Sequence, residues 1–180
     1  MKTMMDEYEF ELLMEGRHEL TDDLAEVLFE AGCDDGTPAT INGVLRIGFA
    51  REASSFEEAV LSAVRNAESA RFGLRTARIE PSDLVGISEI ARRLGRSREA
   101  ARKYANGERG PGGFPAAVGE GIWRWADVAE WAKKGNLAGQ PINLTHARET
   151  AAINDVLDLR QRIGTQSDML RLWRAVALKN

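Results

Sequence analysis

The sequence has little of the chemistry that enzymes, metal sites and disulfide-bonded proteins depend on. Its 180 residues include one cysteine, Cys33, so no internal disulfide can form, and only two histidines, His18 and His146, in no metal-binding spacing. Cys33 stands beside Asp34 and Asp35, whose negative charges raise the pKa of a thiol and oppose its activation as a nucleophile. No phosphate-binding loop, dinucleotide fingerprint or nucleophile elbow is present. We therefore expect a protein that is not an enzyme and that needs no metal or cofactor.

Long apolar runs are also missing from the chain. No segment approaches the roughly 20 apolar residues that a membrane-spanning helix requires. The first residues, MKTMMDEYEFELL, are acidic and have neither the basic end nor the apolar core of a signal peptide. These absences predict a soluble, cytoplasmic protein without a membrane partner.

Basic residues are outnumbered by acidic ones overall, 24 to 28, but they are concentrated in one region. The formal net charge is −4, yet residues 1–80 carry 8 basic and 17 acidic residues, whereas residues 81–134 carry 10 basic and 7 acidic ones. Within 92–109 there are seven basic residues and two acidic ones. This asymmetry indicates a basic, nucleic-acid-binding face joined to an acidic module that phosphate would repel.

The basic region begins with a predicted amphipathic helix between Leu84 and Gly95. Its apolar residues follow the i, i+3, i+4, i+7 spacing of a buried stripe. They are Ile87, Ile90, Ala91 and Leu94. Ser88 is expected to cap this helix, and Gly95 to end it in a left-handed conformation that turns the chain.

A second helix, 97–105, is predicted immediately after this turn. Ser97 is expected to cap it, Ala101 and Tyr104 to face inward, and the charged residues between them to face outward. A capped, arginine-bearing second helix behind a tight turn is typical of a helix-turn-helix that places this helix in the DNA major groove.

The residues that follow predict a small wing and a third helix. Glycine and proline turns fill 106–113, after which Phe114–Val118 and Ile122–Trp125 are predicted as two strands of a hairpin. A helix over Asp127–Lys134 completes the pattern. Trp123 or Trp125, together with Phe114 and Trp131, is expected to pack in the core rather than stack on bases.

This ordered series resembles the winged helix-turn-helix domains of excisionase and MerR-like proteins over about residues 84–134. The resemblance rests on Glu89-Ile90-Ala91, Leu94-Gly95, Ser97-Arg98, Phe114-Pro115, Trp123, Asp127-Val128 and Trp131. It implies sequence-specific binding of double-stranded DNA by a transcriptional regulator.

The candidate DNA contacts have different expected roles. Arg98 and Arg102 lie four residues apart, on one helix face, and are expected to read bases, because an arginine can bond two guanine acceptors. Glu99 either accepts from a cytosine amino group or holds Lys103 in place. The residues of the first helix and turn are expected to position phosphates, and Arg124 either contacts phosphate or stacks on an aromatic ring. Arg109 resembles the basic residues of the wing in this superfamily. The full set is Arg92, Arg93, Arg96, Ser97, Arg98, Glu99, Arg102, Lys103, Arg109 and Arg124.

Residues 1–81 are predicted to form an acidic α+β domain. The patterns give strands at Tyr8–Met14, Thr40–Ile41, Val44–Ala50 and Leu74–Glu80, and helices at Thr21–Ala31 and from Ser55 to near Gly73. Asn42-Gly43 predicts a hairpin turn. The order β-α-β-β-α-β is the ferredoxin-like arrangement. Such a domain can bind a protein, bind a small effector or be purely architectural, and topology alone does not decide.

The chain is thus expected to be an α+β protein with a ferredoxin-like domain (1–81), a winged helix-turn-helix domain (82–135) and a C-terminal helical hairpin (142–180). Residues Gly135–Pro141 are predicted as a linker, and the hairpin as helices 145–162 and 167–178 that either pair two chains or pack on the chain's own domains. The main interpretation is a homodimeric transcriptional regulator. Two alternatives are an antitoxin-like protein that sequesters a partner through its N-terminal domain or C-terminal hairpin, and an excisionase-like DNA-bending factor.

Overall fold

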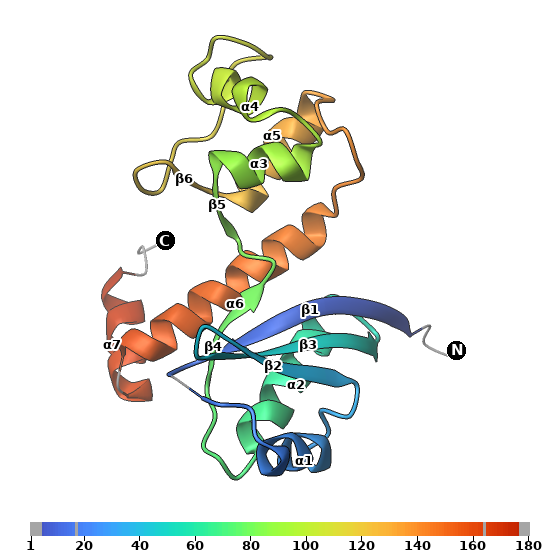
Figure 1. Cartoon of the computed structure of the whole chain (residues 1–180). Helices are drawn as coiled ribbons and strands as arrows, with labels where there is room; N and C mark the ends of the chain where they lie inside the picture. Colours follow the sequence, from blue (N-terminus) through green and yellow to red (C-terminus); the bar gives the residue numbers. More distant parts are fainter. Residues whose placement is uncertain (1–4, 17, 164, 177–180) are drawn as a thin grey trace. The chain divides into compact units, whose positions relative to one another are not determined.

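The computed structural model describes residues 5–16, 18–163 and 165–176 (Figure 1). The chain divides into two compact units, Met1–Pro81 with Ile153–Asn180, and Ser82–Ala152. We call the first the sheet unit and the second the helical unit. The C-terminal segment is shared between the units, because the long helix α6 (Leu144–Arg162) contributes to both.

The sheet unit is a four-stranded antiparallel sheet with two helices on one face (Figure 1). Along the chain its elements are β1 (Asp6–Met14), α1 (Asp22–Glu30), β2 (Gly36–Ile41), β3 (Val44–Ala53), α2 (Phe56–Ser69) and β4 (Thr76–Glu80). The strands lie in the order β2-β3-β1-β4. The predicted succession of strands and helices is confirmed, although α2 ends at Ser69, short of Gly73, and β4 begins only at Thr76.

Local sequence signals explain most of these boundaries. The hydroxyl groups of Thr21 and Ser55 accept hydrogen bonds from the Leu24 and Glu58 amides and so cap α1 and α2. Between β2 and β3, Asn42 (φ 54°) and Gly43 (φ 80°) both adopt the left-handed conformation of a two-residue hairpin turn.

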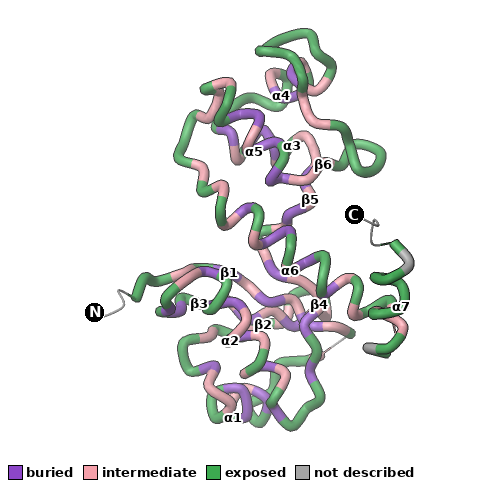
Figure 2. The backbone as a smooth tube through the Cα atoms, turned by 180° about the vertical axis from the view of Figure 1, so that it is seen from behind, coloured by how far each residue is buried: buried purple, intermediate pink, exposed green. Residues whose placement is uncertain are grey.

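Buried and more exposed residues alternate along β1 and β3 (Figure 2). On β1 and β3 the buried side chains meet α1 and α2, and Phe10 stacks on its cross-strand neighbour Phe49 with ring centroids 5.3 Å apart. The fully buried core side chains include Leu12, Met14, Leu28, Leu45, Ile47, Val60, Leu74 and Ile79. Burial of this apolar surface is the main stabilising contribution to the unit.

Side chains of α6 cover the backbone of the edge strand β4. The buried Asn154 side chain accepts from the Ile79 amide (2.8 Å) and donates to the Ile79 carbonyl (3.1 Å), as a neighbouring strand would. Arg160 donates to the Thr76 carbonyl and Gln161 to the Ala77 carbonyl. These contacts satisfy an edge that would otherwise be open to pairing with another strand.

The helical unit contains five further elements before the start of α6. They are β5 (Leu84–Gly86), α3 (Ile87–Leu94), α4 (Arg98–Ala105), β6 (Ile122–Arg124) and α5 (Trp125–Lys134). β5 and β6 form a two-stranded antiparallel sheet. The core includes Val85, Ile90, Leu94, Ala101, Tyr104, Val128, Trp125 and Trp131, with Phe114 and Trp123 packed against it, as predicted for the aromatic residues.

The predicted strand 114–118 and the predicted cap at Ser88 are wrong. Phe114–Val118 is not a strand, and β6 pairs with β5 instead, because Leu84–Gly86 is extended and leads directly into α3. Because α3 begins at Ile87, directly after the last residue of β5, Gly86 occupies the capping position and provides no side-chain hydrogen bond. Ser88 therefore lies inside the helix.

The C-terminal helices are α6 and α7 (Gln166–Val176), close to the predicted ranges. The predicted junction residue Gly164 and the predicted end of the second helix at Leu178 lie outside the described residues. Large apolar side chains of the two helices are exposed, among them Val156 (59%), Trp173 (73%) and Val176 (77%). Within the described ranges, no helix combines the length and apolarity needed to span a bilayer.

Candidate nucleic-acid interface

The geometry of α3, the turn and α4 follows from residues that the sequence marks clearly. Ile90 and Leu94 are buried on α3, as are Ala101 and Tyr104 on α4. Gly95, at φ 62°, ends α3 in the left-handed conformation that lacks a steric penalty only for glycine. The Ser97 hydroxyl accepts from the Ala100 amide (3.2 Å) and starts α4, as predicted.

The outer side of α4 carries four charged residues, which differ in whether their side chains already have a partner. Arg98 is exposed and makes no side-chain hydrogen bond or ion pair within the described part of the chain. Arg102 donates twice to the Glu99 carboxylate, at 3.1 and 3.0 Å, and Lys103 lies 3.7 Å from the same group. Hydrogen bonding from Arg102 lowers the pKa of Glu99. Because the Glu99–Arg102 pair is exposed and screened by solvent, it contributes little to stability, and a stronger acceptor can replace it.

On α3, one carboxylate gathers two arginines. Glu89 accepts from Arg92 at 2.8 and 2.6 Å and from Arg93 at 2.6 Å, and the hydrogen bond from Arg92 is the largest cause that lowers the pKa of Glu89 to about 2. The Arg92 side chain is 67% exposed, whereas that of Arg93 is 11% exposed and its guanidinium lies 5.1 Å from the Trp125 ring centroid. This geometry leaves Arg92 accessible to a phosphate and favours a packing role for Arg93.

Segment 135–141, predicted as a linker, instead packs against the end of α3. The Gly139 amide donates to the Leu94 carbonyl (2.9 Å), and the Gln140 side chain donates to the carbonyls of Arg92 and Arg93. These bonds satisfy carbonyls at the end of α3 that lack partners within the helix. A Cβ atom at Gly139 would lie 2.9 Å from the Leu94 carbonyl oxygen, so glycine is required here.

The glycine-rich loop 106–113 is anchored to the aromatic core. The Trp131 indole donates to the Gly112 carbonyl (2.8 Å), and the Tyr104 and Trp131 rings lie 5.4 Å apart. A Cβ atom at Gly110 would lie 3.1 Å from the Tyr104 ring. Arg109, beside Gly110, is exposed and makes no side-chain hydrogen bond or ion pair among the described residues. The loop thus presents one arginine from an anchored backbone.

Two arginines predicted as DNA contacts also have partners inside the unit. Arg96 donates to the Leu137 carbonyl at 3.1 Å but remains exposed. Arg124 lies 3.7 Å from the carboxylate of the buried Asp83, whose backbone carbonyl accepts from the Trp125 amide. Arg124 is therefore tied to the junction between β6 and α5.

Sequence reasoning missed two groups of polar residues that the fold brings together. One is the cover of α3 by Gly139 and Gln140, which are distant in sequence and carry no recognisable motif. The other lies in the sheet unit, where Arg51 donates to Asp35 at 2.7 and 2.6 Å. In both cases the partners lie too far apart along the sequence for a local sequence pattern to connect them.

Cys33 is buried in the core of the sheet unit. Burial is the main cause that raises the pKa of Cys33 to about 11, and Asp34 and Asp35 raise it further, in the direction predicted. Among the residues described, no group of three or more His, Cys, Asp or Glu side chains is placed to hold a metal ion.

Comparison with protein-family models, curated proteins and solved structures found no match for this chain.

Proposed function

We propose that the protein binds double-stranded DNA in a sequence-specific manner and acts as a cytoplasmic transcriptional regulator. The observation that carries this proposal is α4, a capped helix held behind a glycine turn with Arg98 and Arg102 four residues apart on its exposed side. A helix of this kind fits the major groove, where arginine bonds the two acceptors of guanine.

The topology of both units supports the finer fold assignment. Three helices, a two-stranded sheet and an anchored glycine-rich loop in the helical unit fit a compact winged helix-turn-helix in which the loop, rather than a β-hairpin, serves as the wing. In the sheet unit, the β-α-β-β-α-β succession and the strand order β2-β3-β1-β4 fit a ferredoxin-like domain.

Within this proposal the arginines have separate tasks. Arg98 is free to read a base, and Arg102 reads one by exchanging its exposed bond to Glu99 for a guanine edge. Arg92, Arg96 and Arg109 position phosphates, which supplies affinity without sequence preference. Arg93 and Arg124 are assigned to packing, because each is held by groups of the helical unit.

The proposal includes a homodimer. The apolar face that α7 exposes around Trp173 and Val176 needs a cover, and a second copy would supply it. Two reading helices would then meet an inverted repeat whose half-sites lie about one helical turn apart.

The decisive experiment selects bound sequences from a random duplex pool at a stated, near-physiological salt concentration. Wild type is expected to enrich an inverted repeat. Arg98→Ala and Arg102→Ala are each expected to lose preference at one position of the half-site, with a discrimination of about 1–3 kcal/mol removed. Arg92→Ala is expected to weaken binding to all sequences alike and to reduce the salt dependence.

Lys133→Ala is the matched control, since Lys133 is an exposed basic residue at the end of α5 with no assigned contact. If both α4 variants select the same site as wild type, α4 does not read the bases. If wild type enriches nothing and its binding simply fades with salt, the protein makes phosphate contacts only, and the proposal of sequence-specific regulation fails.

A further inference from the structure

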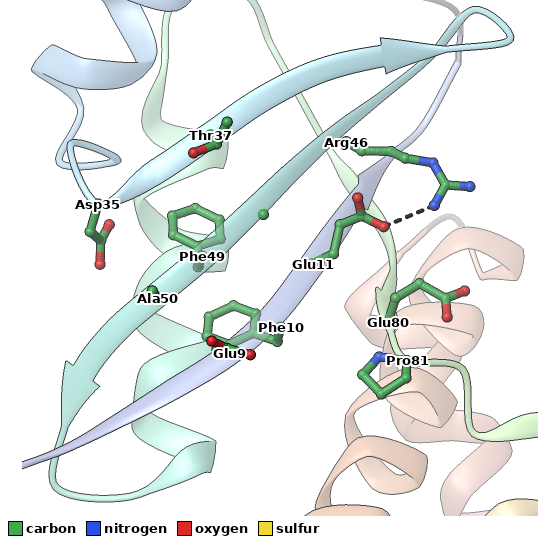
Figure 3. Close-up of a pocket in the computed structure, with 11 residues that line it drawn as sticks. Glu9, Phe10, Glu11, Asp35, Thr37, Arg46, Phe49, Ala50, Glu80 and Pro81 are labelled. Carbon is green, nitrogen blue, oxygen red and sulfur yellow. Dashed lines mark hydrogen bonds and ion pairs between the residues drawn. The ribbon is translucent and has the colours of Figure 1, made fainter. Parts of the chain in front are cut away.

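The open face of the sheet, opposite α1 and α2, contains a shallow hollow of about 750 Å³ (Figure 3). Its floor is formed by the small residues Gly48 and Ala50 of β3, and its sides include Thr37 of β2 and the carboxylates of Glu9 and Glu11 on β1. All of these residues belong to the sheet unit. None of them contributes to the proposed DNA interface.

Gly48 has no evident structural reason to be glycine. It lies within β3, an inner strand of the sheet, where glycine is less stabilising than a side chain that packs. A Cβ atom at Gly48 would meet only the Thr37 carbonyl oxygen, at 4.0 Å. By contrast, a Cβ atom at Gly36 would lie 2.9 Å from the Phe49 ring, so that glycine is required by packing. A strand glycine with free space above it is typical of a site that another chain approaches closely.

Four acidic side chains line the hollow. Glu9 and Glu11 belong to β1, Asp35 precedes β2, and Glu80 ends β4. Arg46 donates to Glu11 at 2.8 Å and balances part of this negative charge (Figure 3). A surface with an excess of negative charge favours a partner of positive charge.

We propose that this face docks a basic amphipathic helix of a partner protein. Helices are the usual cover of a sheet face, and the low floor at Gly48 and Ala50 admits an apolar helix stripe. Lysines and arginines flanking that stripe pair with Glu9 and Glu11. A second copy of the same sheet face is excluded as occupant by its like charge, and DNA is excluded by its phosphates.

The probe is a labelled helical peptide of about five turns, with an alanine and leucine stripe flanked by lysines and arginines. A scrambled peptide of equal composition controls for charge alone. The full-length protein is expected to bind the amphipathic peptide at least about tenfold more tightly than the scrambled one. A tenfold ratio of affinities distinguishes binding to a specific site from non-specific electrostatic attraction.

Two variants test shape and charge separately. Gly48→Leu fills the hollow without clashing with the backbone, and Glu9→Lys reverses one charge, so each is expected to weaken peptide binding about tenfold or more. Glu26→Lys makes the same charge change on the exposed side of α1 and is expected to leave binding unchanged. Thermal unfolding monitored by circular dichroism verifies that each variant is folded.

The outcomes are distinguishable from those of the DNA experiment. Equal binding of both peptides, or binding unaffected by Gly48→Leu, overturns the proposal, as does an equal loss in Glu26→Lys. A change in the sedimentation of Gly48→Leu without peptide would make the face a contact between copies and would also overturn it. Site selection on DNA is expected to be the same for Gly48→Leu and wild type, so the two proposals succeed or fail independently.

Discussion

Glu89 is the carboxylate on which two arginines of α3 converge. Its pKa is lowered to about 2, so the charged form stabilises the folded helical unit. A carboxylate with a depressed pKa contributes fully above its unfolded-state pKa of about 4.3, and the contribution is lost as the pH falls from there toward 2. The group is about one-third exposed, and solvent screening reduces its net contribution to about 1 kcal/mol.

We therefore predict that Glu89→Gln lowers the free energy of unfolding of the helical unit by about 1 kcal/mol at pH 7, and by less at pH 3. Urea denaturation followed by tryptophan fluorescence measures this, because three of the four tryptophans lie in this unit. An equal difference between variant and wild type at both pH values would show that the charge of Glu89 is not the cause.

At the scale of single residues, the sequence predicts a residue's structural role best where that role depends only on neighbouring residues. Ser97 caps α4 and Gly95 turns the chain because each needs only its immediate neighbours. Ser88 was a wrong cap for a non-local reason. Pairing of β5 with β6 fixes the start of α3, and the capping position then falls on Gly86.

At the scale of elements, the contact between α6 and β4 supports the edge of the sheet. Asn154 is fully buried and pairs with both backbone groups of Ile79. We predict that Asn154→Ala costs about 2–3 kcal/mol of unfolding free energy, because it leaves a buried amide and a buried carbonyl without partners. Gln161→Ala, which removes one exposed bond to the Ala77 carbonyl, is expected to cost less than about 1 kcal/mol.

Chemical denaturation followed by far-ultraviolet circular dichroism provides both values for the Asn154 and Gln161 variants. Equal costs for the two would mean that burial of the Asn154 amide does not determine the stability of this edge. Hydrogen exchange at the Ile79 amide gives an independent readout, since Asn154→Ala is expected to accelerate it.

Helices and strands in which apolar residues repeat regularly can be predicted from the sequence, whereas short extended segments cannot. The hydrophobic alternation of β1 and the Asn-Gly turn before β3 specified the sheet elements closely. Segment 114–118 has a strand-like composition but is not a strand, although Val118 donates one backbone hydrogen bond to Ile122 of β6. Leu84–Gly86 is a strand because β6 lies beside it. A strand of three residues is too short to show the alternation of apolar and polar residues by which strands are predicted.

For the whole molecule, the separation of charge is the dominant feature. The acidic sheet unit is suited to a protein partner and the basic α3–α4 region to DNA, so one chain is expected to carry both proposed interfaces. Self-association through α7 would join two such chains.

We predict that Trp173→Lys, at a side chain 73% exposed on α7, converts a dimer to a monomer in sedimentation equilibrium. Loss of bivalency should weaken binding to an inverted repeat about 100-fold while leaving a single half-site unaffected. Phe29→Lys is the matched control, because Phe29 is an exposed apolar residue on α1 (64%). A wild-type protein that sediments as a monomer at all concentrations would contradict the dimer.

By itself, the sequence determined the α+β class, the succession of most helices and strands, the turn at Gly95 and the outward position of the charged residues on α4. Each of these depends on caps, turn residues or periodicity, which act over a few residues. Only the tertiary structure decided that Gly139 and Gln140 complete α3, that Asn154 closes the edge of β4 and that Arg93 packs on Trp125. It also placed the acidic hollow around Gly48. Those features depend on side chains that meet only after the chain has folded, and no local pattern encodes such distances.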